Sequence, residues 1–202
     1  MAFSTLKRNL LFVRLVRFIT RIFFFPFFNI QTEGLKNIPS KGSFVLLPKH
    51  QRWEDIPILA IAIERPLHYM AKKELFNSLI SNWFMSSLGG IPLDRQKPTR
   101  SRGSFERMIG LLEKDEGIVI FPEGTYFKEK MGAGYEGLIR MVLSRIDSVF
   151  IPVGIRYIKR RGRTLVRLSI GKPVGNLFHG NSKKMIDYIM KEIAGHSGLS
   201  IQ

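Results

Sequence analysis

One short segment, HQRWED, places a histidine and a carboxylate at a spacing that could do acid–base chemistry. His50 opens the segment and Asp55 closes it. On one continuous helix the two side chains would point about 140° apart, so a direct contact between them requires a turn. A carboxylate that holds one imidazole nitrogen leaves the other free to take a proton from a substrate hydroxyl. The alternative is that Asp55 caps a helix and His50 is a polar loop residue.

A second segment, GIVIFPEGT at residues 117–125, is an apolar strand that runs straight into polar groups. Glu123, Gly124 and Thr125 follow the strand without a break. The end of a strand is where an α/β sheet usually places its ligand groups, so these three residues are candidates for a binding site. The alternative is an ordinary turn.

A third segment, GGIPLDR at residues 89–95, ends a short apolar strand with an arginine. The planar fork of Arg95 suits bidentate binding of a phosphate group. The alternative is that Arg95 only forms a surface ion pair with its neighbour Asp94.

The elements that must position these segments alternate along the chain. Short apolar runs predict strands at 43–47, 67–71, 91–93, 117–121, 149–157 and 164–171. Amphipathic patterns predict helices at about 55–63, 73–88, 103–115, 134–146 and 181–195. Such alternation favours an α/β domain. The basic turn at 159–163 predicts a hairpin, so we expect a mixed β-sheet flanked by helices.

The amino-acid composition limits the kinds of site and partner that this chain can have. The chain has 202 residues, of which 45% are hydrophobic, enough for one domain with a sizeable core. It has no cysteine, which excludes disulfides, thiolate metal sites and a cysteine nucleophile. The formal net charge of +16 favours an anionic partner: nucleic acid, anionic lipid or an acidic protein.

The N-terminal segment, residues 1–28, carries basic residues and no acid. Its apolar stretch is interrupted by arginines too often for a helix that spans a bilayer. At helical spacing, Lys7, Arg14, Arg17 and Arg21 fall within an arc of about 80°, beside a wide apolar face. This pattern predicts a helix that lies in a membrane interface, with its arginines near lipid phosphates. The alternative is a core-covering helix with a solvated charged edge.

Together these segments resemble the glycerolipid acyltransferase family, whose type members are 1-acylglycerol-3-phosphate acyltransferases. The resemblance covers about residues 30–175. Four motifs occur in the family's order: HQRWED, GIPLDR, FPEGT and VFIPVGI. The segment AKKELF at residues 71–76 is similar to the family's stretch between the first two motifs, and the N-terminal helix is similar to the family's membrane anchor.

The resemblance implies a role for each matched residue. His50 would be the general base on the acceptor hydroxyl, and Asp55 would orient it. The expected substrate-binding residues are Arg95, Glu123, Gly124, Thr125 and Lys72, around an acceptor phosphate. The implied donor is an acyl thioester of coenzyme A or acyl carrier protein, and the implied acceptor is lysophosphatidate. No cofactor and no metal are expected.

One departure leaves the acceptor open. Family members commonly continue FPEGT with an arginine and a serine, whereas this chain has Tyr126 and Phe127. Lys128 or Lys130 could replace the arginine. Another lysolipid, a lyso-aminolipid or glycerol 3-phosphate therefore stay as alternative acceptors.

We therefore predict a membrane element at residues 1–28 and an acyltransferase domain at residues 29–202. The expected partner is an anionic phospholipid surface, with the protein peripheral or monotopic on the cytoplasmic face. A non-catalytic basic membrane- or nucleic-acid-binding protein is the alternative of another class. We expect no nucleic-acid partner, because such binding explains neither the phenylalanine-rich N-terminus nor FPEGT. His68, His179 and His196 have no metal-ligand spacing.

Overall fold

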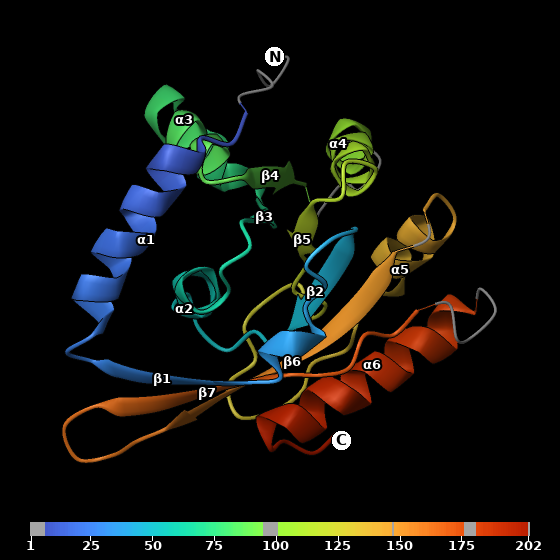
Figure 1. Ribbon diagram of the computed structural model, residues 1–202. Helices are drawn as coiled ribbons and strands as arrows, with labels where there is room; N and C mark the ends of the chain where they lie inside the picture. Colours follow the sequence, from blue (N-terminus) through green and yellow to red (C-terminus); the bar gives the residue numbers. More distant parts are fainter. Residues whose placement is uncertain (1–6, 95–100, 147, 176–180, 202) are drawn as a thin grey trace.

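Seven strands form one sheet in the order β1-β7-β6-β2-β5-β3-β4 (Figure 1). This computed structural model describes residues 7–94, 101–146, 148–175 and 181–201. The strands are β1 Phe28–Glu33, β2 Phe44–Pro48, β3 Leu67–Lys72, β4 Gly90–Leu93, β5 Gly117–Val119, β6 Val149–Ile158 and β7 Thr164–Ile170. Neighbouring strands pair in parallel except β6 and β7, which form the predicted antiparallel hairpin. The prediction of a mixed sheet is confirmed.

Helices cover both faces of this sheet. They are α1 Leu10–Phe24, α2 Asp55–Ala62, α3 Leu79–Ser87, α4 Arg102–Leu112, α5 Glu136–Leu143 and α6 Ser182–Ser197. Two short 3-10 helices lie at Leu35–Asn37 and Lys73–Phe76. Helices α4, α5 and α6 pack on one face, and α2 packs on the other (Figure 1). Helix α1 lies alongside α2.

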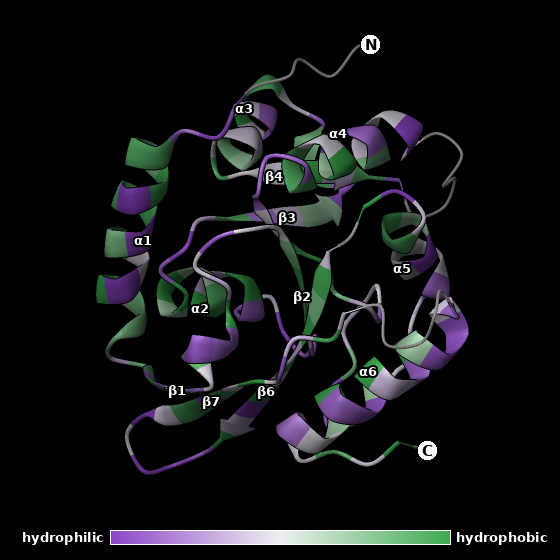
Figure 2. Cartoon of the chain, turned by 45° about the vertical axis from the view of Figure 1, so that its right-hand side comes forward, coloured by the Kyte–Doolittle hydropathy of each residue, from purple (hydrophilic) through white to green (hydrophobic). Residues whose placement is uncertain are grey.

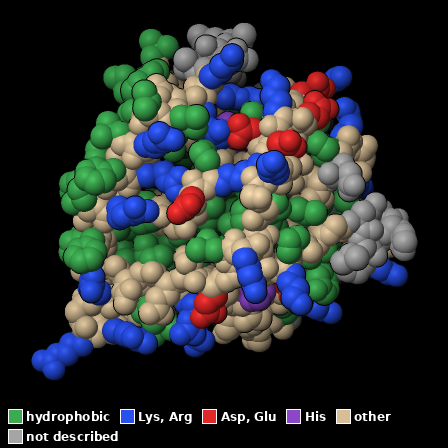
Figure 3. All heavy atoms as spheres, in the orientation of Figure 1, with side chains coloured by type: hydrophobic (Ala, Val, Ile, Leu, Met, Phe, Trp, Pro, Cys, Tyr) green, Lys and Arg blue, Asp and Glu red, His purple; other side chains and the backbone are tan. Residues whose placement is uncertain are grey.

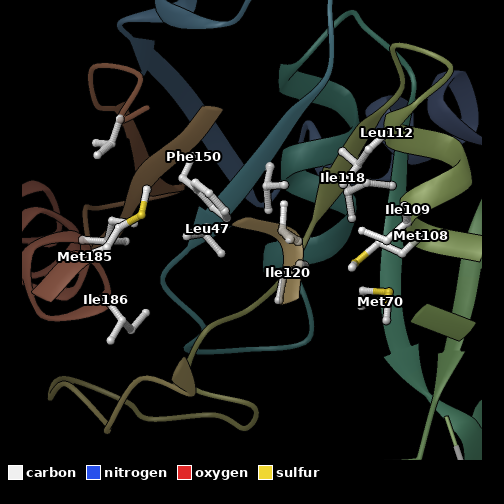
Figure 4. Close-up of a cluster of buried hydrophobic side chains, with 14 of the residues drawn as sticks. Leu47, Met70, Met108, Ile109, Leu112, Ile118, Ile120, Phe150, Met185 and Ile186 are labelled. Carbon is white, nitrogen blue, oxygen red and sulfur yellow. The ribbon is translucent and has the colours of Figure 1, made fainter. Parts of the chain in front are cut away.

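The central strand β2 is buried on both sides and hydrophobic along its length (Figure 2). Because side chains alternate along a strand, Val45 and Leu47 join the cluster under α4 and α6, whereas Phe44 and Leu46 join the cluster under α2. Figure 4 shows the first cluster, in which Leu47 lies near Phe150 of β6. The sheet is therefore packed between two apolar layers of helices. This packing fixes the positions of the strand ends.

Two elements differ from the sequence prediction. Strand β1 was not predicted; it pairs in parallel with β7 at the edge of the sheet. The single helix predicted at 73–88 is wrong, because the chain forms a 3-10 turn and then starts α3 anew. Ser78 caps α3 through a reciprocal capping box with Ser81, and such a box marks a helix start.

Helix α1 occupies the predicted N-terminal position, and two of the arginines predicted to lie near lipid phosphates contact the protein instead. Arg21 donates to the carbonyl oxygen of Ile61 at 3.0 Å, and Arg17 donates to those of Ile63 and Glu64. These carbonyls lie at and just beyond the C-terminal end of α2, where unpaired oxygens attract cations. The two arginines are therefore turned toward the protein. None of the helices in the described residues is both long and apolar enough to cross a membrane.

Candidate active site

The candidate site forms where parallel strands β2 and β5 end side by side. These strands are neighbours in the sheet, so the residues that follow them emerge at the same edge. His50 follows the last residue of β2, Pro48, by two positions, and the FPEGT segment follows β5. The backbone nitrogen of Phe127 donates to the carbonyl oxygen of His50 at 2.9 Å, which ties the two segments together.

His50 and Asp55 are in direct contact. The Nδ1 atom of His50 lies 3.0 Å from Oδ2 of Asp55, because a turn between Arg52 and Asp55 brings the start of α2 back to the histidine. A carboxylate accepts hydrogen bonds, so Nδ1 is the ring nitrogen that carries the hydrogen in this contact. The second ring nitrogen is then left as an acceptor, as a general base requires.

Asp55 is held by further donors that sequence reasoning missed. The backbone nitrogens of Gln51 and Arg52 donate to its Oδ2 at 2.6 and 2.8 Å. The hydroxyl of Tyr157, on β6, donates to its Oδ1 at 2.6 Å. Burial and the neighbouring Asp55 raise the pKa of Tyr157, so the phenol stays protonated and remains a donor. The carboxylate is fully buried and is therefore fixed in one orientation.

A buried ion pair between Lys49 and Glu123 contacts the backbone of His50. The ammonium of Lys49 donates to both oxygens of Glu123, at 2.8 and 2.6 Å, and to the carbonyl oxygen of Phe127 at 2.8 Å. Glu123 also accepts from the backbone nitrogens of His50 and Gly132, at 3.2 and 2.6 Å. Burial lowers the pKa of Lys49, an effect that Glu123 opposes. The pair links the end of β2 to the FPEGT loop.

This geometry gives Glu123 a place different from the substrate contact that the sequence suggested. Its carboxylate is buried and its oxygens are engaged by protein donors. Gly124 has a φ of +68°, a conformation that favours glycine, and a Cβ there would meet the Tyr135 ring at 2.8 Å. Both residues therefore shape the loop that carries Thr125 and Tyr126 into the site.

A cavity of about 640 Å³ opens onto the histidine. Its walls come from α1, α2, β3, α3 and the FPEGT loop, and they are mostly apolar. His50, Lys72, Thr125 and Tyr126 all line it. The His50 ring is stacked on Phe121 at 3.7 Å between centroids and meets the Tyr126 ring at 4.3 Å. The site therefore combines one acid–base pair with room for a long apolar group.

Several predicted residues lie elsewhere or cannot be placed. Arg95 and His179 lie outside the residues that the structure describes. Lys128 and Lys130 are exposed and are not among the described residues that line the cavity. Within the described ranges, no group of three histidines or carboxylates is arranged to hold a metal ion.

A protein-family model matches most of this chain. The model described as Acyltransferase matches residues 29–156, a span that includes His50, Asp55 and the FPEGT segment. The chain belongs to the acyltransferase family. The matched span begins within β1 and ends within β6.

Curated relatives of this chain are named 1-acyl-sn-glycerol-3-phosphate acyltransferase. The protein from Bacillus subtilis is 37% identical over 101 residues, 50% of this chain and 50% of the relative. The chloroplastic protein from Arabidopsis thaliana is 29% identical over 80% of this chain and 47% of its own length. The protein from Streptococcus pneumoniae is 28% identical over 82% of this chain and 62% of its own length. The chain thus spans about half the length of the first two.

A solved structure shares the fold of this chain. It is the 1-acyl-sn-glycerophosphate acyltransferase PlsC from Thermotoga maritima, with a TM-score of 0.76 and 21% identity. The match covers 92% of this chain and 78% of that one. The arrangement of a mixed sheet flanked by helices is therefore shared with a known acyltransferase.

Proposed function

We propose that this protein transfers a fatty acyl group from an acyl thioester to the free hydroxyl of lysophosphatidate. The observation that carries the proposal is the contact between His50 and Asp55, 3.0 Å apart, at the wall of an apolar cavity. A base beside room for an acyl chain is what such a transfer needs. The names of the relatives support lysophosphatidate as the acceptor.

The proposed reaction is a direct displacement. The free ring nitrogen of His50 takes the proton of the acceptor hydroxyl as its oxygen attacks the thioester carbonyl. A carbon–oxygen bond forms, the carbon–sulfur bond breaks, and the imidazolium returns the proton to the departing thiolate of coenzyme A or acyl carrier protein. Asp55 stabilises the imidazolium that forms in between, and Tyr157 and the backbone donors hold Asp55 in place.

We propose further that the protein works on the cytoplasmic face of a membrane, held there by α1. The outward face of this helix exposes large apolar side chains at Leu11, Leu15, Phe18, Ile22 and Phe23. Water-soluble helices present the opposite arrangement, so a bilayer surface is the solvent that suits α1. Its inward face, which includes Val13 and Val16, lines the cavity. A lipid substrate could therefore pass from the bilayer to His50 without crossing water.

Tyr126 supports a second class of acceptor lipid as the alternative to lysophosphatidate. Where relatives of this type commonly place an arginine, this chain sets an aromatic ring against His50. A phosphate would there lose a bidentate partner. Binding of a lysolipid with a larger headgroup, or of a lyso-aminolipid, would depend less on that arginine contact.

An acceptor screen tests the proposal. The purified protein, in mixed micelles, is given isotopically labelled acyl-coenzyme A or acyl carrier protein and each acceptor in turn, and products are read by mass spectrometry. We expect labelled phosphatidate as the main product. Labelled product from another lysolipid alone would favour the second class, and no labelled ester from any acceptor would overturn acyl transfer.

A further inference from the structure

The first turn of α3 exposes large apolar side chains that nothing in the described fold covers. Leu79 is 90% exposed and Ile80 is 80% exposed, the highest values among the large hydrophobic residues described. Trp83 and Phe84, one turn later, are also exposed. At helical spacing these four side chains lie on one side of α3. The helix, LISNWFMSS, has no charged residue. Two adjacent aliphatic side chains that are this exposed indicate a surface that contacts another protein or a membrane.

This turn is continuous with the apolar face of α1. The ring of Phe12, on α1, lies 5.1 Å from the ring of Trp83 and 5.8 Å from that of Phe84. The backbone nitrogen of Asn9 donates to the carbonyl oxygen of Ser87 at 3.0 Å, which joins the two helices. Figure 3 shows hydrophobic side chains along the edge of the molecule that α1 and α3 form in Figure 1.

The two helices also flank the same cavity. Val13 and Val16 of α1 and Phe84 and Met85 of α3 are among its walls. Cations are found on the same elements: Lys72 is exposed and lines the cavity, and Arg14 is exposed on α1. Exposed apolar side chains together with exposed cations fit a bilayer that contains anionic lipids better than they fit water.

We propose that the first turn of α3 inserts into the bilayer as a second contact beside α1, so that the cavity faces the lipid between them. The proposal rests on the proposed membrane association through α1, which it extends. One helix fixes only a line on the surface, whereas two contacts also fix the rotation of the domain about that line. The cavity and His50 would then meet the bilayer in one orientation.

Trp83 itself is the probe. The chain has two tryptophans, so Trp53→Phe leaves Trp83 as the only one. This variant is mixed with vesicles of phosphatidylcholine and phosphatidylglycerol whose acyl chains are brominated. We expect a blue shift of the Trp83 emission and quenching by the bromines. Unshifted, unquenched emission from protein that co-sediments with the vesicles would overturn insertion of α3 and leave α1 as the anchor.

Paired substitutions test the same turn in the otherwise unchanged protein. Ile80→Ser should weaken partitioning onto these vesicles about tenfold, as loss of an inserted aliphatic side chain implies. The matched control is Ile201→Ser, a change of the same chemistry at a residue 47% exposed on the C-terminal segment, which should leave partitioning unchanged. Equal effects of the two substitutions would overturn the proposal.

Two further measurements distinguish a membrane contact from an interface between copies of the chain. If Ile80→Ser abolishes a concentration-dependent dimer seen by light scattering without vesicles, the turn is such an interface and the proposal is wrong. If the unmodified protein binds no vesicles, both the α3 proposal and the membrane association fall. Acyl transfer to micellar lysophosphatidate would then show whether the proposed reaction survives without them.

Discussion

Tyr157→Phe removes one hydroxyl from the site and leaves the rest of the side chain in place. The phenol donates to Oδ1 of Asp55 at 2.6 Å, while the ring packs under the Arg52 guanidinium at 4.4 Å and beside Phe28. Phenylalanine keeps both ring contacts. The substitution therefore isolates the hydrogen bond to the carboxylate.

The expected magnitude follows from the partners that remain. A hydrogen bond to a charged group contributes about 1.5–3 kcal/mol. Asp55 keeps its contacts with His50, Gln51 and the backbone of Arg52, all through Oδ2, whereas Oδ1 loses the hydroxyl. We expect kcat to fall about tenfold, equivalent to about 1.4 kcal/mol, because the carboxylate is less firmly oriented toward the imidazole.

Steady-state transfer of labelled acyl groups measures this loss in kcat. A double-mutant cycle with Asp55→Asn should be non-additive, since both substitutions act through one carboxylate. An unchanged kcat in Tyr157→Phe, or additive effects in the cycle, would refute the assignment of Tyr157 as a positioning residue.

Three further predictions concern Lys49, His68 and Arg95. Lys49→Met should lower the free energy of unfolding by about 3–5 kcal/mol, because Glu123 keeps a buried charge without its ammonium partner. Denaturant titration measures this loss. If the double variant Lys49→Met/Glu123→Gln recovers none of the lost stability, the unpaired charge of Glu123 is not the cause. Burial, with Arg8 nearby, lowers the pKa of His68 from 6.5 to about 4, so the unfolded chain binds an extra proton between these values. The free energy of unfolding should fall by a few kcal/mol as pH drops through that window, at about 1.4 kcal/mol per pH unit, and an equal fall in His68→Gln would exclude this histidine as the cause. Arg95→Ala should raise the acceptor KM about 10- to 100-fold and spare the donor KM, since a charge-assisted bond contributes about 1.5–3 kcal/mol; an unchanged acceptor KM would remove Arg95 from the site.

The parts of the fold that sequence predicted are those with strong local signals. Buried strands such as β2 and β5 are short apolar runs, and the basic turn at 159–163 marks a hairpin. The contact between His50 and Asp55 required only a local turn, which the start of α2 supplies. The break before α3 was also present locally, because the Ser78 and Ser81 pair signals a helix start.

The parts that sequence missed depend on contacts between distant segments. Lys49 and Glu123 are 74 residues apart, and Tyr157 and Asp55 are 102 apart. No spacing rule links such pairs; the order of strands in the sheet does. A signal for Lys49 was its place directly after a buried strand, where a lysine needs an anionic partner if it stays buried. Strand β1 gains its place from pairing with β7, which no local pattern specified.

Acyl transfer by His50→Ala tests most directly whether His50 is the base. Labelled acyl-coenzyme A and lysophosphatidate are given to the variant and to the unchanged protein under identical conditions, and the initial rates are compared. We expect a rate lower by about 10²–10⁴, the usual contribution of a positioned general base, with unchanged thermal unfolding and vesicle binding. A rate within a few-fold of that of the unchanged protein would contradict the assignment of His50 as the base.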